Sequence, residues 1–150
     1  MLRGDGHGHF TPVPPAESGI VVPGDAKALA VIDFDQDGWP DFLVSRNDST
    51  TLAFRNGGVA GRRSLSVLLR GTACNPATIG ARVTVQMRDG SAQVGEIHAG
   101  SGYYSQSTPT CFFGYSESNP PQRIRVRWPS GSASSHEVPA GSSRLILTAG

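Results

Sequence analysis

Hydrophobic and polar residues alternate with a period of two along much of the chain. In the cleanest run Ile124, Val126 and Trp128 alternate with three arginines. Such alternation places the apolar side chains on one face of a strand and leaves the arginines in water. Similar runs predict about seven short strands after residue 64, near 65–69, 83–87, 93–99, 110–115, 124–128, 134–138 and 144–148. The Asp89-Gly90 pair between two of these runs is a strong hairpin signal.

The turns between these strands are rich in Gly, Pro, Ser and Asn, and no stretch keeps a helical period of 3.6. The pattern therefore predicts little helix and a small β-sandwich of about 85 residues in the second part of the chain. Trp128 is expected in the core of this sandwich, with its strand ending at Pro129.

The first sixty residues show a different pattern. Residues 26–34 form a continuous apolar run, which predicts a strand buried on both faces. Two more strands are expected at 42–45 and 51–54, turning at 47–49, and residues 9–13 could form another before a run of prolines. The fold class is therefore all-β: an antiparallel meander followed by the sandwich.

Charge divides the chain at the same place. Residues 1–60 carry four basic and eight acidic residues, a net charge of −4, whereas residues 61–150 carry nine and four, a net charge of +5. The change of sign beside a Gly-rich loop predicts two modules, 1–60 and 61–150.

No aromatic residues or recognition helix accompany the arginines, so a nucleic-acid partner is not expected. No apolar run is long enough for a membrane span, and residues 1–10 lack the apolar core of a secretory signal.

An acidic loop, residues 33–41, lies between the first two strands of the meander. Its carboxylates, Asp33, Asp35, Asp37 and Asp41, stand at positions 1, 3, 5 and 9, with Gly at position 6 and Trp39 at position 7. This spacing is typical of a calcium loop, in which position 7 supplies a backbone carbonyl. All-oxygen ligation favours calcium over zinc or copper. The alternative is an acidic turn without an ion, whose aspartates cap backbone amides.

An EF-hand is excluded, because strands flank the loop and position 12 is Val44 rather than glutamate. The motif Asp-x-Asp-x-Asp-Gly-x-x-Asp between two apolar strands instead resembles the FG-GAP or VCBS repeat of integrin-type β-propellers. The resemblance implies a propeller-blade-like meander over residues 1–60. It also implies calcium as the cofactor, with Asp33, Asp35, Asp37 and Asp41 as side-chain ligands and Trp39 as the backbone ligand.

The second module resembles the ASPIC/UnbV domain, which follows such repeats in cartilage acidic protein and in bacterial secreted proteins. Four motifs occur in the order of that family, namely Ile79-Gly80-Ala81-Arg82-Val83, the run 100–107 (Gly-Ser-Gly-Tyr-Tyr-Ser-Gln-Ser), Phe113-Gly114, and the run 126–131 (Val-Arg-Trp-Pro-Ser-Gly). Within the second motif, Tyr103 and Tyr104 form either a structural corner or a surface that stacks on sugars.

The two cysteines, Cys74 and Cys111, are separated by 36 residues, a spacing unlike that of a zinc site. In an oxidising compartment they could form a disulfide, and the alternative is two unrelated thiols.

Together these features predict a secreted or cell-surface, calcium-binding module for adhesion or assembly, with a protein or a cell-surface glycan as its partner. No catalytic residues are assigned, and an enzyme is not expected. A closed propeller needs at least four blades, so an isolated blade leaves free strand edges. A self-assembling fibre subunit is therefore one alternative, and a carbohydrate-binding or carbohydrate-acting protein is another.

Overall fold

The computed structural model describes residues 1–150 and contains twelve strands and one four-residue helix. The all-β prediction is confirmed. The first part of the chain comprises β1 (Leu2–Gly4), β2 (Phe10–Pro12), α1 (Pro15–Ser18), β3 (Ala26–Ile32), β4 (Asp41–Arg46) and β5 (Ser49–Phe54). The second part comprises β6 (Arg62–Arg70), β7 (Arg82–Met87), β8 (Ala92–Glu96), β9 (Thr110–Ser116), β10 (Pro121–Arg127), β11 (Ala133–Glu137) and β12 (Arg144–Thr148).

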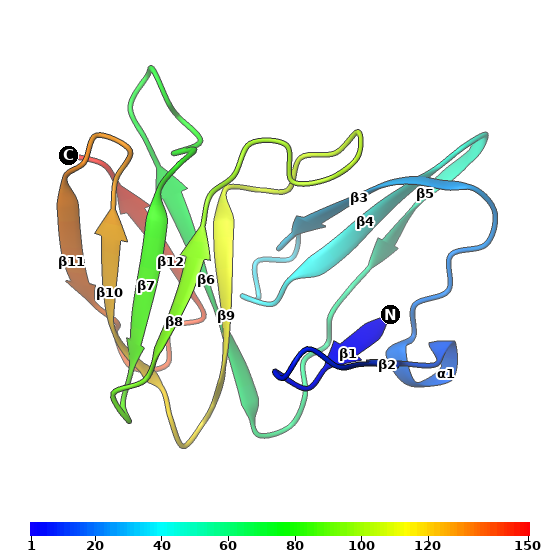
Figure 1. Ribbon diagram of the computed structural model, residues 1–150, viewed down its shortest axis with the longest axis horizontal. Coiled ribbons are helices and arrows are strands. Elements are labelled where there is room, and N and C mark those ends of the chain that lie inside the picture. The colour runs from blue at the N-terminus through cyan, green and yellow to red at the C-terminus, as the bar shows by residue number, and fades with distance from the viewer.

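The second part of the chain forms a two-layer sandwich (Figure 1). One layer has the strand order β11-β10-β7-β8, and the other has the order β12-β6-β9. The seven strands match the seven that alternation predicts. Asp89 and Gly90 turn the chain between β7 and β8, and Gly90 has the positive φ that such a turn requires. One pairing has no signal in the sequence, because β12 runs parallel to β6, from Arg144 opposite Ser66 to Thr148 opposite Arg70.

Fourteen buried residues form one hydrophobic core, and all of them lie within the sandwich, between Leu65 and Leu147. Alternate residues of β6, β7, β9 and β10 supply most of it. Trp128 is 4% exposed, as the sequence predicts, and its Nε1 donates a hydrogen bond to Ser134 Oγ at 3.0 Å.

The first part of the chain forms a separate three-stranded antiparallel sheet, β3-β4-β5, which we call the blade, and a short β1-β2 hairpin lies below it in Figure 1. β4 and β5 turn at residues 47 and 48, as predicted. The expectation that the first blade strand is buried on both faces is wrong, since Leu29 at the centre of β3 is 46% exposed. β3 is an edge strand, and no residue of the blade joins the hydrophobic core.

Candidate metal centre at the blade–sandwich junction

The acidic loop connects β3 to β4 and folds around its own carboxylates. Asp33 Oδ2 accepts a hydrogen bond from Gly38 N at 3.2 Å, and Asp37 Oδ1 accepts one from Trp39 N at 2.8 Å. Gln36 and Gly38 both have positive φ, of 63° and 92°, and these two residues turn the chain back on itself. The side chains at alternate positions therefore point to one centre, as the sequence pattern predicts.

Three carboxylates meet at that centre. Asp33, Asp35 and Asp37 each offer an oxygen, and these oxygens lie within 4.8 Å of one another. Asp33 Oδ1 is buried and has no hydrogen-bond partner. A buried carboxylate oxygen without a donor is unfavourable, because this oxygen has lost its water without gaining a hydrogen bond, although Oδ2 of the same side chain has its donors. A bound cation would satisfy this oxygen and offset the repulsion among the three carboxylates.

Arg55, which directly follows β5, provides a positive charge at the same place. Its guanidinium donates to Asp35 Oδ2, and its Nη2 lies 3.5 Å from Asp37 Oδ2. The hydrogen bond from Arg55 holds the pKa of Asp35 below its usual value of 3.8, and the same contact raises the pKa of Arg55. Arg55 therefore acts as a counter-ion within the chain, and a cation bound by Asp35 would compete with it.

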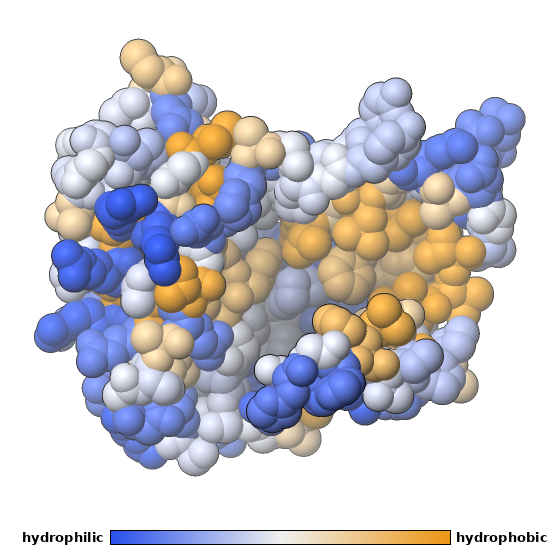
Figure 2. Space-filling view, viewed as in Figure 1, coloured by the Kyte–Doolittle hydropathy of each residue, from blue (hydrophilic) through white to orange (hydrophobic).

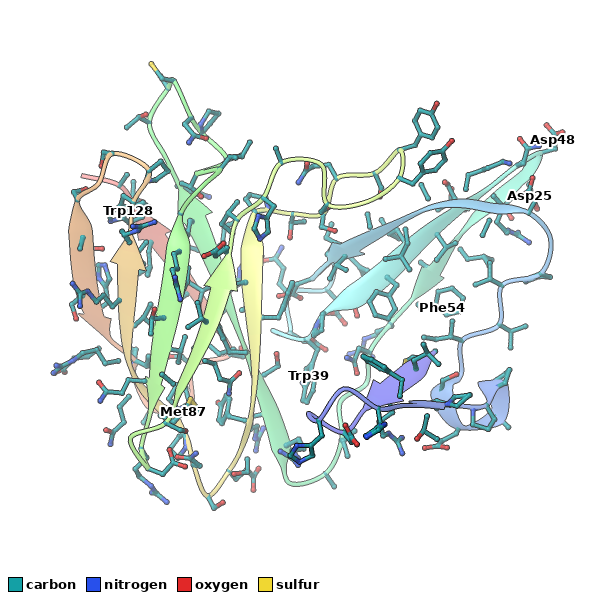
Figure 3. All side chains as sticks on the ribbon, viewed as in Figure 1. Asp25, Trp39, Asp48, Phe54, Met87 and Trp128 are labelled. Carbon is teal, nitrogen blue, oxygen red and sulfur yellow. The ribbon has the colours of Figure 1, made fainter.

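The other two predicted ligands are used differently. Asp41 is fully buried, and its two oxygens accept hydrogen bonds from Phe34 N at 3.1 Å and from Asn56 N at 2.8 Å. It does not belong to the group of three carboxylates that meet at the centre. The ring of Trp39 packs against Gly58, where an added Cβ would lie 2.9 Å from the indole. The indole extends downward from the loop in Figure 3, between the sandwich and the β1-β2 hairpin, and it lines a pocket together with Ser64 of β6.

The loop rests on the outer side of β6, so the metal centre lies at the junction of the two parts of the chain. Ser66 Oγ, on β6, donates to Asp33 Oδ2 at 3.3 Å. Gly38 is buried against Ser143, and Arg144 donates a hydrogen bond to the side chain of Gln36. Because Ser66 lies 33 residues from Asp33, nothing in the local sequence indicates that it contacts the loop. The one available hint is Leu68, which interrupts the alternation of β6 and is half-buried on the same outer face.

The disulfide that the two cysteines could form is not present, and both thiols are free. Cys111 belongs to the hydrophobic core, whereas Cys74 is exposed in the loop between β6 and β7. Burial raises the pKa of Cys111 to about 11, which favours the protonated thiol over the reactive thiolate at neutral pH. One thiol therefore lies inside the sandwich and the other in the solvent.

The two tyrosines of the second motif are exposed. Tyr103 and Tyr104 are 73% and 85% exposed, and their rings make an edge-to-face pair with centroids 4.4 Å apart. Their loop is ordered by polar contacts from Gln106 and Ser101, which bond to its backbone. The backbone of Tyr103 and Tyr104 nevertheless forms a tight turn, closed by a bridge between Gly102 and Ser105 and with a φ of 48° at Tyr104, so these residues form a structural corner whose rings lie in solvent. A surface that stacks on sugars stays a prediction.

α1, the helix of the structure, is too short to cross a membrane.

No curated protein matches the chain. The family model for ASPIC and UnbV matches residues 71–150. This range includes strands β7 to β12 and all four of the motifs named in the sequence analysis. ASPIC/UnbV domains are modules of the extracellular type without an assigned activity. This match covers more than half of the chain, and the chain therefore belongs to the ASPIC/UnbV family.

Proposed function

We propose that the chain is a calcium-binding, non-enzymatic module of a secreted or cell-surface protein, used for adhesion or assembly. In this proposal the blade is an FG-GAP or VCBS repeat, and calcium fixes its acidic loop against the ASPIC/UnbV sandwich. The observation that carries the proposal is the cluster of Asp33, Asp35 and Asp37, which encloses a buried carboxylate oxygen without a partner.

The donor set suits a hard cation. Asp33, Asp35 and Asp37 would hold the ion, and the resemblance to propeller repeats adds the carbonyl of Trp39 and the carboxylate of Asp41. Oxygen-only coordination by carboxylates and carbonyls is what calcium prefers. Because the hydrogen bond from Ser66 joins Asp33 to β6, an ion held by Asp33 would also stabilise the contact between blade and sandwich.

The proposal is tested by thermal unfolding with calcium, with magnesium and with chelator. A site filled at 100 times its dissociation constant stabilises the fold by about 2.7 kcal/mol. For a chain of this length the melting temperature then rises by about 5–10 °C. Asp35→Asn should lose this shift. Asp48→Asn, which removes a carboxylate from the turn between β4 and β5, should keep it. Coincident curves with calcium and with chelator would contradict the proposal.

Self-association is a second candidate, favoured by the exposed surface of the blade. The blade and the neighbouring hairpin present a hollowed apolar surface (Figure 2), and Phe10, Leu29 and Phe34 are 66%, 46% and 43% exposed. β3 and β5 are both edge strands, which are able to pair with another chain. Light scattering behind size exclusion should then show a molar mass that climbs with concentration. A constant mass of 15.7 kDa would exclude this candidate.

A further inference from the structure

The outer face of the sheet β11-β10-β7-β8 carries a group of arginines that we call the arginine face. It consists of Arg82 on β7 and of Arg123, Arg125 and Arg127 on β10, and all four are exposed. Alternate residues of a strand lie about 6.6–6.8 Å apart, so the three arginines of β10 form a row about 13 Å long. Figure 2 shows hydrophilic residues gathered over these strands.

Acidic residues lie at two corners of this face and leave its centre uncompensated. Glu96 Oε1 lies 3.8 Å from Arg82 Nη1, and Glu137 is the cross-strand neighbour of Arg123. Arg125 lies between two hydroxyl residues of the adjacent strands, and its side chain makes no hydrogen bond or ion pair. The positive charge at the centre is therefore free to attract an anion from solution.

Two arginines of this face stand directly opposite each other. Arg127 of β10 pairs in register with Arg82 of β7, and like charges in this arrangement are destabilising. These two residues and Arg125 surround a hollow of about 270 Å³. The remainder of its lining consists of Thr84, Gly131 and Ala133. Three guanidinium groups and no carboxylate line this anion hollow, and only that of Arg82 has an acidic neighbour, Glu96, so the hollow is suited to an oxyanion.

A second hollow of about 460 Å³ adjoins the first and shares Thr84 and Arg125 with it. Arg123, Gln86 and Ser135 also line it, so charged donors alternate with hydroxyl and amide groups. The two hollows together present positions for several anionic groups, with hydrogen-bonding groups between them. An extended ligand fits this arrangement better than a single small ion.

We propose that the arginine face binds a sulfated polysaccharide, with one sulfate in the anion hollow and further sulfates along the arginines of β10. The planar guanidinium fork matches the oxygens of a sulfate, and the hydroxyl and amide groups can bond to sugar hydroxyls. A nucleic acid fits less well, because the face has no aromatic side chain on which a base could stack. This surface is distinct from the acidic loop, so the proposal does not depend on calcium.

The test measures the binding of heparin, a sulfated polysaccharide, to the full chain by titration calorimetry. The variant R125Q/R127Q removes two guanidinium groups that have no partner in the protein and relieves the repulsion between Arg127 and Arg82, so its melting temperature should not fall below that of the wild type. Its heparin affinity should fall by about tenfold or more. The control R62Q/R70Q makes the same change of charge at two exposed arginines of β6, in the other sheet. Its affinity should fall by no more than about twofold.

Two further measurements separate sulfate recognition from general attraction. Heparin affinity of the wild type should decrease as sodium chloride rises from about 50 to 200 mM, more steeply than that of R125Q/R127Q. Hyaluronan, which carries carboxylates but no sulfates, should bind more weakly than heparin. Equal loss in the two variants, equal binding of hyaluronan, or tighter binding of a thymidine oligonucleotide or of phosphatidylserine vesicles would each overturn the proposal. Absence of heparin binding at the lower salt concentration would also overturn it.

Discussion

Replacement of Gly38 by alanine should weaken the contact between the acidic loop and the sandwich and destabilise the fold. Gly38 is buried, its φ is +92°, and an added Cβ would lie 2.5 Å from the carbonyl oxygen of Ser143 and 2.9 Å from its Cβ. The obstacle is backbone, so a change of side-chain rotamer cannot remove the overlap. Either the loop or the segment before β12 must move.

Two costs add at this position. A left-handed backbone costs an L-residue about 1–2 kcal/mol relative to glycine. Forcing a methyl group into a packed site costs about 1–3 kcal/mol more. We therefore expect Gly38→Ala to lower the free energy of unfolding by about 2–5 kcal/mol, as measured by denaturation in urea.

Gly131→Ala is the matched control. Gly131 has a φ of +89°, and an added Cβ there would have nothing within 4 Å. This variant should therefore lose only the backbone part, about 1–2 kcal/mol. If the two variants lose the same free energy, within about 0.5 kcal/mol, the methyl group meets no obstacle at Ser143. The docking of the loop on the sandwich would then be refuted.

The remaining predictions concern single side chains. Asp41→Ala should destabilise the chain by about 2–4 kcal/mol in denaturant melts, even with chelator, because two backbone amides lose a charged acceptor; an unchanged midpoint would contradict the role of Asp41 as a structural cap. Arg55→Gln should raise the pKa of Asp35 towards 3.8, as followed by NMR titration, and should tighten calcium binding. In the wild type, the stabilisation from this pair is present above pH 3.8 and is lost as the pH falls through the lower pKa of folded Asp35. Iodoacetamide at pH 8 should modify Cys74 alone in the folded chain and both thiols in denaturant; rapid labelling of Cys111 would show that it is not buried. As the pH rises above about 9, ionisation of the Cys111 thiol should begin to favour the unfolded state, because its folded pKa is about 11.

The strands of the sandwich could be located and oriented from the sequence wherever one face of a strand meets water. In β10 the apolar residues Ile124 and Val126 face the core and the arginines face solvent, so alternation alone locates the strand and orients it. In β6 the same reasoning fails for Ser64 and Ser66. Alternation assigns them to solvent, yet they are 5% and 1% exposed, because residues from distant parts of the chain cover that face.

The candidate metal centre likewise contains a part that the sequence predicts and a part that it does not. The positions of Asp33, Asp35 and Asp37 follow from the spacing within one loop, so their convergence could be predicted. The ion pair with Arg55 and the contact with Ser66 depend on how separate strands pack, for which a single sequence contains no local signal. The exposure of β3 is a failure of the opposite kind. A continuous apolar run predicts that both faces of the strand are covered by other parts of the protein, but it does not identify the segments that would cover them.

The parallel pairing of β12 with β6 has a consequence for the order in which the protein is made. β6 is the middle strand of its sheet, and one of its neighbours consists of residues 144–148. A ribosome that adds about 5–20 residues per second needs about 4–16 s to proceed from the end of β6 to the end of β12. During that interval one edge of β6 has no partner, although its residues are among the most buried of the folded sandwich. The sandwich therefore closes only after nearly the whole domain has emerged, which makes the nascent chain a natural client for factors that shield unpaired strands.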